Sequence, residues 1–311
     1  MRWAILPLLI VPGLLAAAAP DCKLIRIEEW QVRVEGHLPT VDGEINGSRV
    51  AIALDTGAER SQMTRPAATR LALTRYDVPG PRAAEAVRID ELKLGSGIRK
   101  NWSVLVAPEY DFATDVSLIL GQDFFYATDL ELDFANRAVR FFQPKDCEGV
   151  SLAYWARDGS ASDIRLESGS RIMFGVSING RPLRAALDTG AAVSSLAMTE
   201  ASLFGLTPKS PGVVAAGCSL RIGRKPVDYW SGPVESFAIG NEVIRNPSMR
   251  FGETAIEAAS QFALVPQMVL GMDFLRAHRV LVSNSQRRLY FSYVGGTVFP
   301  PGPIKGCQDL R

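Results

Sequence analysis

The chain has 311 residues, a formal net charge of +1, two histidines and four cysteines. So small a net charge provides no basic surface for nucleic acid, and the length predicts roughly two domains. His37 and His278 stand in no H-x-x-H spacing and beside no G-x-S-x-G motif, which disfavours a zinc site and a histidine-based hydrolase. We therefore expect neither a metal nor another cofactor, and we expect carboxylates to carry any acid–base chemistry.

The first predicted element is an apolar N-terminal segment. Arg2 precedes the apolar run Trp3–Leu15, which is followed by four alanines and Pro20. This pattern predicts a secretory signal peptide over residues 1–18, cleaved after Ala18, and hence a periplasmic or secreted protein. An uncleaved membrane anchor is the alternative. No later segment has the ~18 uninterrupted apolar residues of a membrane span, so the mature chain is expected to cross no membrane.

Two matched hairpins come next in chain order. Apolar residues alternate on both sides of Asn46-Gly47 and again on both sides of Asn179-Gly180, and such alternation around Asn-Gly predicts a β-hairpin. The second strand of each hairpin runs directly into Asp-Thr-Gly-Ala, at Asp55–Ala58 and at Asp188–Ala191. In both copies the Asn lies nine residues before the Asp, so the chain contains an internal repeat.

A second pair of matched blocks completes the repeat. Leu118–Phe125 and Met268–Leu275 each contain Leu-Gly-x-Asp-Phe, and a predicted strand ends in Phe twenty residues after the glycine in both copies. Residues 149–168 are rich in Gly, Ser, Ala and Asp without periodicity, which is typical of a linker. The prediction is an all-β chain with an N-terminal lobe at 19–148, a linker at 149–168 and a C-terminal lobe at 169–311.

The duplicated Asp-Thr-Gly-Ala motif points to carboxylate chemistry. Two lobes about a pseudo-twofold axis would bring Asp55 and Asp188 together, and two carboxylates in contact share one proton. One can then act as base on a water while the other polarises a carbonyl, which hydrolyses a peptide bond without metal or histidine. The neighbouring residues are expected to allow close approach of the two loops and to hydrogen-bond across them; they are Thr56, Gly57, Ala58, Thr189, Gly190 and Ala191.

The paired motifs resemble those of the pepsin/retropepsin superfamily of aspartic proteases. Each Asp-Thr-Gly-Ala is followed by an apolar-apolar-Gly block, at Ile119-Leu120-Gly121 and Val269-Leu270-Gly271, and the Leu-Gly-x-Asp-Phe form is most similar to bacterial retropepsin-like proteases. The resemblance extends from about Ile25 to Phe291. It implies a bilobal fold of two barrel-like lobes, a catalytic Asp55/Asp188 dyad, and Gly121 and Gly271 in strands beneath the active loops.

The resemblance also implies a hairpin flap in each lobe, near residues 76–89 and 213–234. Neither Tyr76 nor Tyr229 is clearly the flap tyrosine of the family. Ala58 and Ala191 lack a hydroxyl that would stabilise the ionised dyad, so the sequence predicts a less acidic pH optimum than that of pepsin.

The four cysteines permit three pairings in an oxidising compartment. Cys22 and Cys147 flank the N-terminal lobe, and the ends of compact domains often lie close together, so we predict a Cys22–Cys147 disulfide. Cys218 and Cys307 would then pair in the second lobe.

The sequence therefore predicts an exported aspartic endopeptidase that acts on peptides or proteins, with a monomer sufficient because each lobe supplies one Asp. The alternatives are a peptide-binding module without turnover and a structural envelope protein. Asp123 and Asp273 are interpreted as helix caps or as local hydrogen-bond acceptors rather than as a second catalytic pair.

Overall fold

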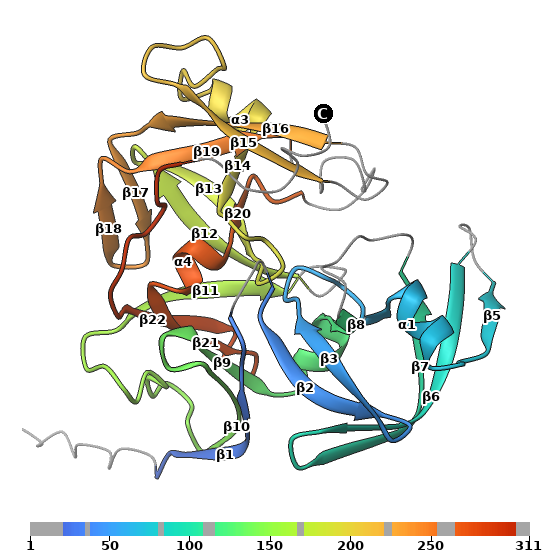
Figure 1. The fold of residues 1–311 in the computed structure, drawn as a ribbon. Helices are drawn as coiled ribbons and strands as arrows, with labels where there is room; N and C mark the ends of the chain where they lie inside the picture. The colour runs from blue at the N-terminus through green and yellow to red at the C-terminus, as the bar shows by residue number, and fades with distance from the viewer. Residues whose placement is uncertain are drawn as a thin grey trace, which may run out of the picture.

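The computed structural model describes residues 21–34, 38–79, 84–107, 116–166, 171–220, 226–253 and 265–302. The predicted signal peptide and His37 lie outside these residues. The fold is mostly β, as predicted, and consists of two lobes joined by a shared sheet (Figure 1). Among the described residues, the helices are too short to cross a membrane.

Lobe one contains a seven-stranded sheet with the order β2-β3-β8-β4-β7-β6-β5. Its strands are β2 (Thr40–Ile45), β3 (Ser48–Leu54), β4 (Gln62–Met63), β5 (Arg75–Val78), β6 (Ala84–Leu94), β7 (Gly97–Val106) and β8 (Val116–Leu120). Two short helices follow β4 and β8: α1 (Arg65–Arg70) and α2 (Gln122–Phe125). Strands β3 and β8 are parallel, so the predicted active loop that follows β3 and Gly121, which follows β8, lie at the same end of the sheet.

Lobe two repeats this order as β12-β13-β20-β14-β19-β16-β15. Its strands are β12 (Ile172–Ile178), β13 (Arg181–Leu187), β14 (Ser195–Ala197), β15 (Val214–Leu220), β16 (Pro226–Pro233), β17 (Ser236–Ile239), β18 (Glu242–Arg245), β19 (Ser248–Gly252) and β20 (Met268–Leu270). Its helices are α3 (Met198–Ser202) and α4 (Met272–Leu275). Lobe one has a single hairpin of β6 and β7. In lobe two each of these strands is broken in two, so β6 corresponds to β16 followed by β17, and β7 corresponds to β18 followed by β19.

The predicted Asn-Gly turns are present and attach each hairpin to its lobe. Asn46 and Asn179 adopt left-handed φ angles of 49° and 50°. The side-chain oxygen of Asn46 accepts the amides of Asp90 and Glu91, and that of Asn179 accepts the amides of residues 235 and 236. Each turn therefore fixes the position of the strand that crosses over it.

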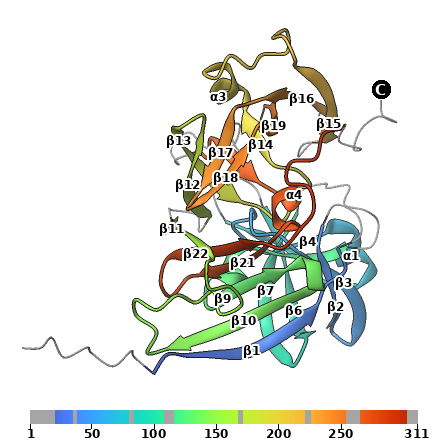
Figure 2. The same cartoon turned by 90° about the vertical axis from the view of Figure 1, so that its left-hand side faces the viewer.

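A central sheet joins the lobes in the order β1-β10-β9-β21-β22-β11. Its members are β1 (Lys23–Gln31), β10 (Ala138–Lys145), β9 (Asp129–Asp133), β21 (His278–Ser283), β22 (Arg288–Tyr293) and β11 (Ser160–Leu166). Strands β9 and β21 come from different lobes and pair antiparallel, with Leu132 opposite Val280. Figure 2 shows these strands one above the other from β1 to β11. The pseudo-twofold axis passes between β9 and β21, since the two sides of the sheet match strand for strand.

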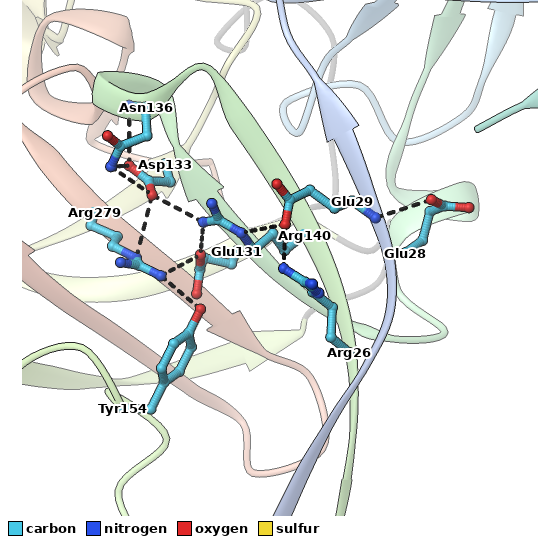
Figure 3. A network of polar contacts seen from close by, with 9 residues as sticks. All are labelled: Arg26, Glu28, Glu29, Glu131, Asp133, Asn136, Arg140, Tyr154 and Arg279. Atoms are coloured by element: carbon cyan, nitrogen blue, oxygen red, sulfur yellow. Dashed lines mark hydrogen bonds and ion pairs between the residues drawn. The ribbon is translucent and has the colours of Figure 1, made fainter. Parts of the chain in front are cut away.

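Buried charges fasten this junction (Figure 3). Glu131 on β9 is fully buried and accepts hydrogen bonds from Arg140 at 2.5 Å and from Arg279 at 2.9 Å. Arg140 also donates to Asp133 and to Glu29, each at 2.9 Å. Arg279 belongs to β21, whereas the other four residues belong to lobe one, so the network holds the lobes in one relative orientation.

The predicted linker at 149–168 is wrong in its second half. Ser160–Leu166 forms strand β11, which lies between β22 and β12. Its small residues carry little apolar alternation of their own, and Ile164 is its deeply buried apolar side chain. Pairing on both edges, rather than local pattern, therefore determines this strand. The first half also packs on the protein, because Leu152 and Ala153 are buried against Phe142 and Tyr290.

The Cys22–Cys147 disulfide is confirmed. It links the residue before β1 to the chain just after β10, where the ends of lobe one meet. Cys218 is also disulfide-bonded, but its predicted partner Cys307 lies outside the described residues. The Cys218–Cys307 pair therefore remains a prediction.

Candidate active site

The two Asp-Thr-Gly-Ala loops meet at the ends of equivalent strands. Asp55 follows β3 and its amide donates to Leu120 O at 2.9 Å; Asp188 follows β13 and its amide donates to Leu270 O at 2.9 Å. Both contacts are made to the strand that lies parallel to the incoming one. The sheet therefore positions the backbone of both aspartates in the same way.

Threonine hydrogen bonds lock the loops to one another. The amide of Thr56 donates to Oγ1 of Thr189 at 2.9 Å, and the amide of Thr189 donates to Oγ1 of Thr56 at 3.0 Å. Each hydroxyl donates in turn across the axis, from Thr56 to Leu187 O at 3.1 Å and from Thr189 to Leu54 O at 2.7 Å. Both threonines are buried, so every one of these polar groups needs its partner in the opposite lobe.

Glycine is required next to each threonine because the opposite aspartate occupies the space of a side chain. A Cβ on Gly57 would lie 2.3 Å from Cγ of Asp188, and a Cβ on Gly190 would lie 2.6 Å from Cγ of Asp55. Any larger residue would displace the facing carboxyl group. The glycines therefore set how closely the two carboxyls approach.

The two carboxyls form a coupled pair. The Oδ1 atom of Asp55 accepts the amides of Gly57 and Ala58, both at 2.9 Å, and the Oδ1 atom of Asp188 accepts those of Gly190 and Ala191 at 2.7 and 3.1 Å. The carboxyls also hydrogen-bond to one another.

Their electrostatics favour one shared proton. Burial and the charge of Asp188 raise the pKa of Asp55 to about 8. Burial also raises the pKa of Asp188, against the lowering effect of the hydrogen bonds that it accepts from Gly190 and from Asp55. Both side chains keep partial solvent exposure, so a water molecule can reach them.

Gly121 and Gly271 lie beneath the loops and begin α2 and α4. A Cβ on Gly121 would lie 2.8 Å from Ala58 O, and one on Gly271 would lie 2.6 Å from Ala191 O. The chain after each glycine thus passes directly against the active loop. This close passage explains why both copies have glycine at this position.

Asp123 and Asp273 do not cap these helices, because Gly121 and Gly271 are the cap residues and no side chain caps either helix. The Oδ1 atom of Asp123 instead accepts the amide and hydroxyl of Ser61, both at 2.7 Å. Asp273 accepts the same groups of Ser194 at 2.7 and 2.6 Å. The prediction of capping was wrong, and the predicted alternative of a local hydrogen bond holds for Asp273, which also accepts the amide of Phe274 at 2.9 Å. The serine partners lie more than sixty residues away in sequence. The pair supports the loops from below.

An inter-lobe ion pair beside the dyad was not found by sequence reasoning. Arg171 precedes β12 and its guanidinium lies 3.1 Å from the carboxylate of Glu59, which follows Ala58. The positive charge of Arg171 acts to lower the pKa of Asp188. Each residue occurs in only one of the two copies of the repeat: the counterpart of Arg171 is Leu38 and that of Glu59 is Ala192, so no duplicated signal indicated them.

Hairpins are present where the flaps were predicted. Strands β5 and β6 pair from Arg75 opposite Val87 to Val78 opposite Ala84, and β15 pairs with β16. Tyr76 on β5 is 42% exposed. The turns between these strands lie outside the described residues.

Comparison with known proteins agrees with this arrangement. Residues 41–127 and 174–277 match the family described as gag-polyprotein putative aspartyl protease, and together they cover more than half of the chain. The fold and the two matched loops are those of an aspartic-protease-like protein. The chain belongs to this gag-polyprotein aspartyl protease family.

Solved structures with a similar fold include two at low identity. An aspartic proteinase from Irpex lacteus is 11% identical, with 87% of this chain and 97% of that chain covered and a TM-score of 0.48. Conglutin gamma, a basic 7S globulin from lupine seeds, is also 11% identical, with 89% and 96% covered and a TM-score of 0.48. None of the curated proteins compared matches this chain.

Proposed function

We propose that this protein is an exported aspartic endopeptidase whose catalytic dyad is Asp55 and Asp188. Membership of an aspartyl protease family supports a protease function in general. The observation that carries the proposal is the reciprocal fit of the two loops: each threonine is hydrogen-bonded, and each glycine is sterically matched, to the other lobe. A fold that kept its lobes together for structural reasons alone would not need two facing carboxyls at this axis, because burying such a pair is costly.

The chemistry follows from the shared proton. Asp188 is ionised and takes a proton from a water molecule held between the carboxyls, while Asp55 donates a hydrogen bond to the substrate carbonyl. As the water oxygen adds to the carbonyl carbon, Asp55 transfers its proton to the carbonyl oxygen, which gives a tetrahedral gem-diol. When this collapses, Asp188 passes the proton taken from the water to the leaving nitrogen, a gem-diol hydroxyl returns a proton to Asp55, and the C–N bond breaks to give a carboxylic acid and an amine. The hairpins β5–β6 and β15–β16 are proposed to cover an extended peptide over this site.

The direction in which activity changes with pH follows from the pKa of Asp55. Above about pH 8 Asp55 loses the proton that polarises the carbonyl, so activity falls on the alkaline side. On the acid side, activity falls as Asp188 becomes protonated. Both shifts are upward, so the optimum is expected to be less acidic than that of pepsin, and an optimum confined to strongly acidic solution would contradict this account.

Export is supported by the Cys22–Cys147 disulfide, since such bonds persist in oxidising compartments. We propose that residues 1–18 are the signal peptide and that the mature protein works as a periplasmic or secreted monomer. N-terminal sequencing of the exported protein should begin at Ala19. Recovery of the intact N-terminus in a membrane fraction would favour an anchor instead.

The dyad is tested by hydrolysis of a peptide library by the wild type and by the Asp55→Asn and Asp188→Asn variants. Each variant should lose activity by about a thousandfold or more while it keeps its fold, because a residue acting in a dyad has no substitute. The near-isosteric changes remove one titrating group and little volume. Equal turnover in all three proteins would refute the proposal.

A further inference from the structure

An apolar groove lies on the flank of lobe one, between β1 and the tip of the β6–β7 hairpin. It has a volume of about 320 Å³, and its apolar lining includes Ile27, Trp30, Leu92, Leu94, Ile98 and Phe124. Ile27 and Ile98 are 47% and 59% exposed, so the groove presents large aliphatic side chains to solvent. The groove is distinct from the Asp55/Asp188 site, none of whose residues lines it.

The internal repeat identifies the equivalent surface of lobe two. Ile45 pairs with Leu92 in lobe one, and Ile178 pairs with Phe237 in lobe two, so Leu92 and Phe237 are counterparts. Phe124 and Phe274 are counterparts because each is three residues after its loop glycine.

This equivalent surface is filled. The ring of Phe299, which is 3% exposed, lies 5.1 Å from that of Phe237 and 6.4 Å from that of Phe274. The imidazole of His278 stacks on Phe274 at 3.9 Å and bonds to Glu242 at 2.9 Å. In lobe two the chain therefore seals this flank with its own C-terminal segment and a histidine.

Lobe one has no comparable plug among the described residues. The counterpart of His278 is Thr128, and the chain after β10 turns to Cys147 and covers the outer face of the central sheet instead. Trp30 packs on Phe124 and Phe141 at 6.0 and 4.4 Å between ring centroids, yet the groove remains open beside it. The same framework is thus closed in one lobe and open in the other.

We propose that this groove binds an extended segment of a partner protein that inserts a phenylalanine or a similarly large apolar side chain, as Val298-Phe299-Pro300 does in lobe two. The proposal is independent of the catalytic function. In lobe two Arg250 secures the tail by donating to Pro300 O at 2.6 Å and to Gly302 O at 3.0 Å. Lobe one has Leu105 at the position of Arg250, so the partner is held mainly by its apolar anchor, with Arg99 at the groove rim available to a carbonyl or carboxylate.

The chain's own tail provides the probe. A fluorescent ten-residue peptide with the sequence of residues 293–302 is titrated with the full chain carrying Asp55→Asn, so that the peptide is not cleaved, and binding is followed by anisotropy. The peptide should bind, and replacing its phenylalanine by alanine should weaken binding about tenfold or more, because one buried aromatic anchor dominates such contacts.

A matched pair of surface variants locates the binding. Ile98 pairs with Lys93, and Val243 pairs with Ala238, at equivalent positions of the two hairpins; the two side chains are 59% and 52% exposed. Ile98→Glu should abolish binding at the concentrations used, whereas Val243→Glu should leave it unchanged. Absence of binding, or equal binding to both variants, would overturn the proposal.

Light scattering on the free protein distinguishes a partner protein from a second copy. A monomer over the concentration range of the titration is the expected result. A dimer that Ile98→Glu dissociates would show that another copy of this chain fills the groove, and would overturn the assignment to a different protein.

Discussion

The two lobes agree at their shared site and differ on their flanks. Around the axis both copies have the same threonine bonds, the same glycine contacts and the same serine–aspartate support. Away from it, lobe one has a disulfide between the start of β1 and the end of β10 and an open groove, whereas lobe two has β11 inside the sheet and a tail that seals the same flank. Identity between the copies therefore marks the positions that build and support the shared site, and differences mark surfaces where each lobe acts alone.

The strongest test of the shared site replaces each active-loop glycine by alanine. Gly57→Ala and Gly190→Ala should each lower kcat/KM by about a hundredfold or more, because a Cβ at either position collides with the facing carboxyl and displacements of this size are costly in catalysis. The two losses should be similar, since the collisions are equivalent. Peptide hydrolysis under kcat/KM conditions measures both.

Gly175→Ala on β12 is the control, because nothing lies within 4 Å of a Cβ there. It should leave activity unchanged. If one active-loop variant kept full activity while the other lost it, the two loops would not be equivalent and the symmetric account of the site would fail.

The Cys22–Cys147 disulfide is expected to stabilise the flank of lobe one and not that of lobe two. Strand β1 is at the edge of the central sheet and pairs with β10, whereas β11 lies between two strands. The double variant Cys22→Ser/Cys147→Ser should lose about 2–4 kcal/mol of unfolding free energy, since the bond closes a long loop of the unfolded chain. Urea denaturation measures this loss.

Hydrogen exchange on the same variant tests where the loss occurs. Amides of β1 should exchange faster than in the wild type, while those of β11 should keep their protection. Uniform acceleration across both strands would mean that the disulfide stabilises the whole molecule rather than the edge of lobe one.

The elements predicted correctly from the sequence are mainly those that occur in both copies of the repeat. The Asn-Gly hairpins, the Asp55 and Asp188 loops and the glycine blocks were predicted from local pattern plus repetition, and their strands and turns are found where expected. The Cys22–Cys147 bond followed from the same repeat, because it requires that the ends of one lobe meet.

The incorrect predictions concern structure that depends on partners distant in sequence. Strand β11 has weak apolar alternation and exists because β22 and β12 pair with it. The partner of Asp123 is Ser61, and the partner of Arg171 is Glu59 in the other lobe; neither contact leaves a mark in local sequence. These contacts can be recognised only in the folded structure.

The two buried serines beneath the active loops, Ser61 and Ser194, should contribute different amounts to the stability of the protein. Ser194 bridges Gly271 N at 2.9 Å and Asp273 at 2.6 Å, and Ser61 bridges Gly121 N at 3.0 Å and Asp123 at 2.7 Å. Ser→Ala at each site should cost about 1–3 kcal/mol by leaving buried partners unsatisfied.

The larger cost is expected at Ser194. Asp273 is 8% exposed and burial raises its pKa, whereas Asp123 retains access to water that can replace the lost hydroxyl. Thermal denaturation of the two variants, with Ser202→Ala as an exposed control, measures the difference. A larger loss at Ser61 would reverse the ranking of the two supports.

The smallest expected effect concerns Arg171, a charge that breaks the symmetry of the dyad. Arg171 acts to lower the pKa of Asp188, and its lobe-one counterpart is the uncharged Leu38. Arg171→Leu removes this effect, so the pKa of Asp188 rises and the acid limb of the kcat/KM profile should move to higher pH. Glu59→Gln leaves the positive charge in place without its negative partner, so the acid limb should move to lower pH. Both variants lose the same ion pair, so damage from its loss alone would change the two profiles in the same direction. Shifts of opposite sign would show that the charge of Arg171, and not the contact with Glu59, distinguishes the two aspartates.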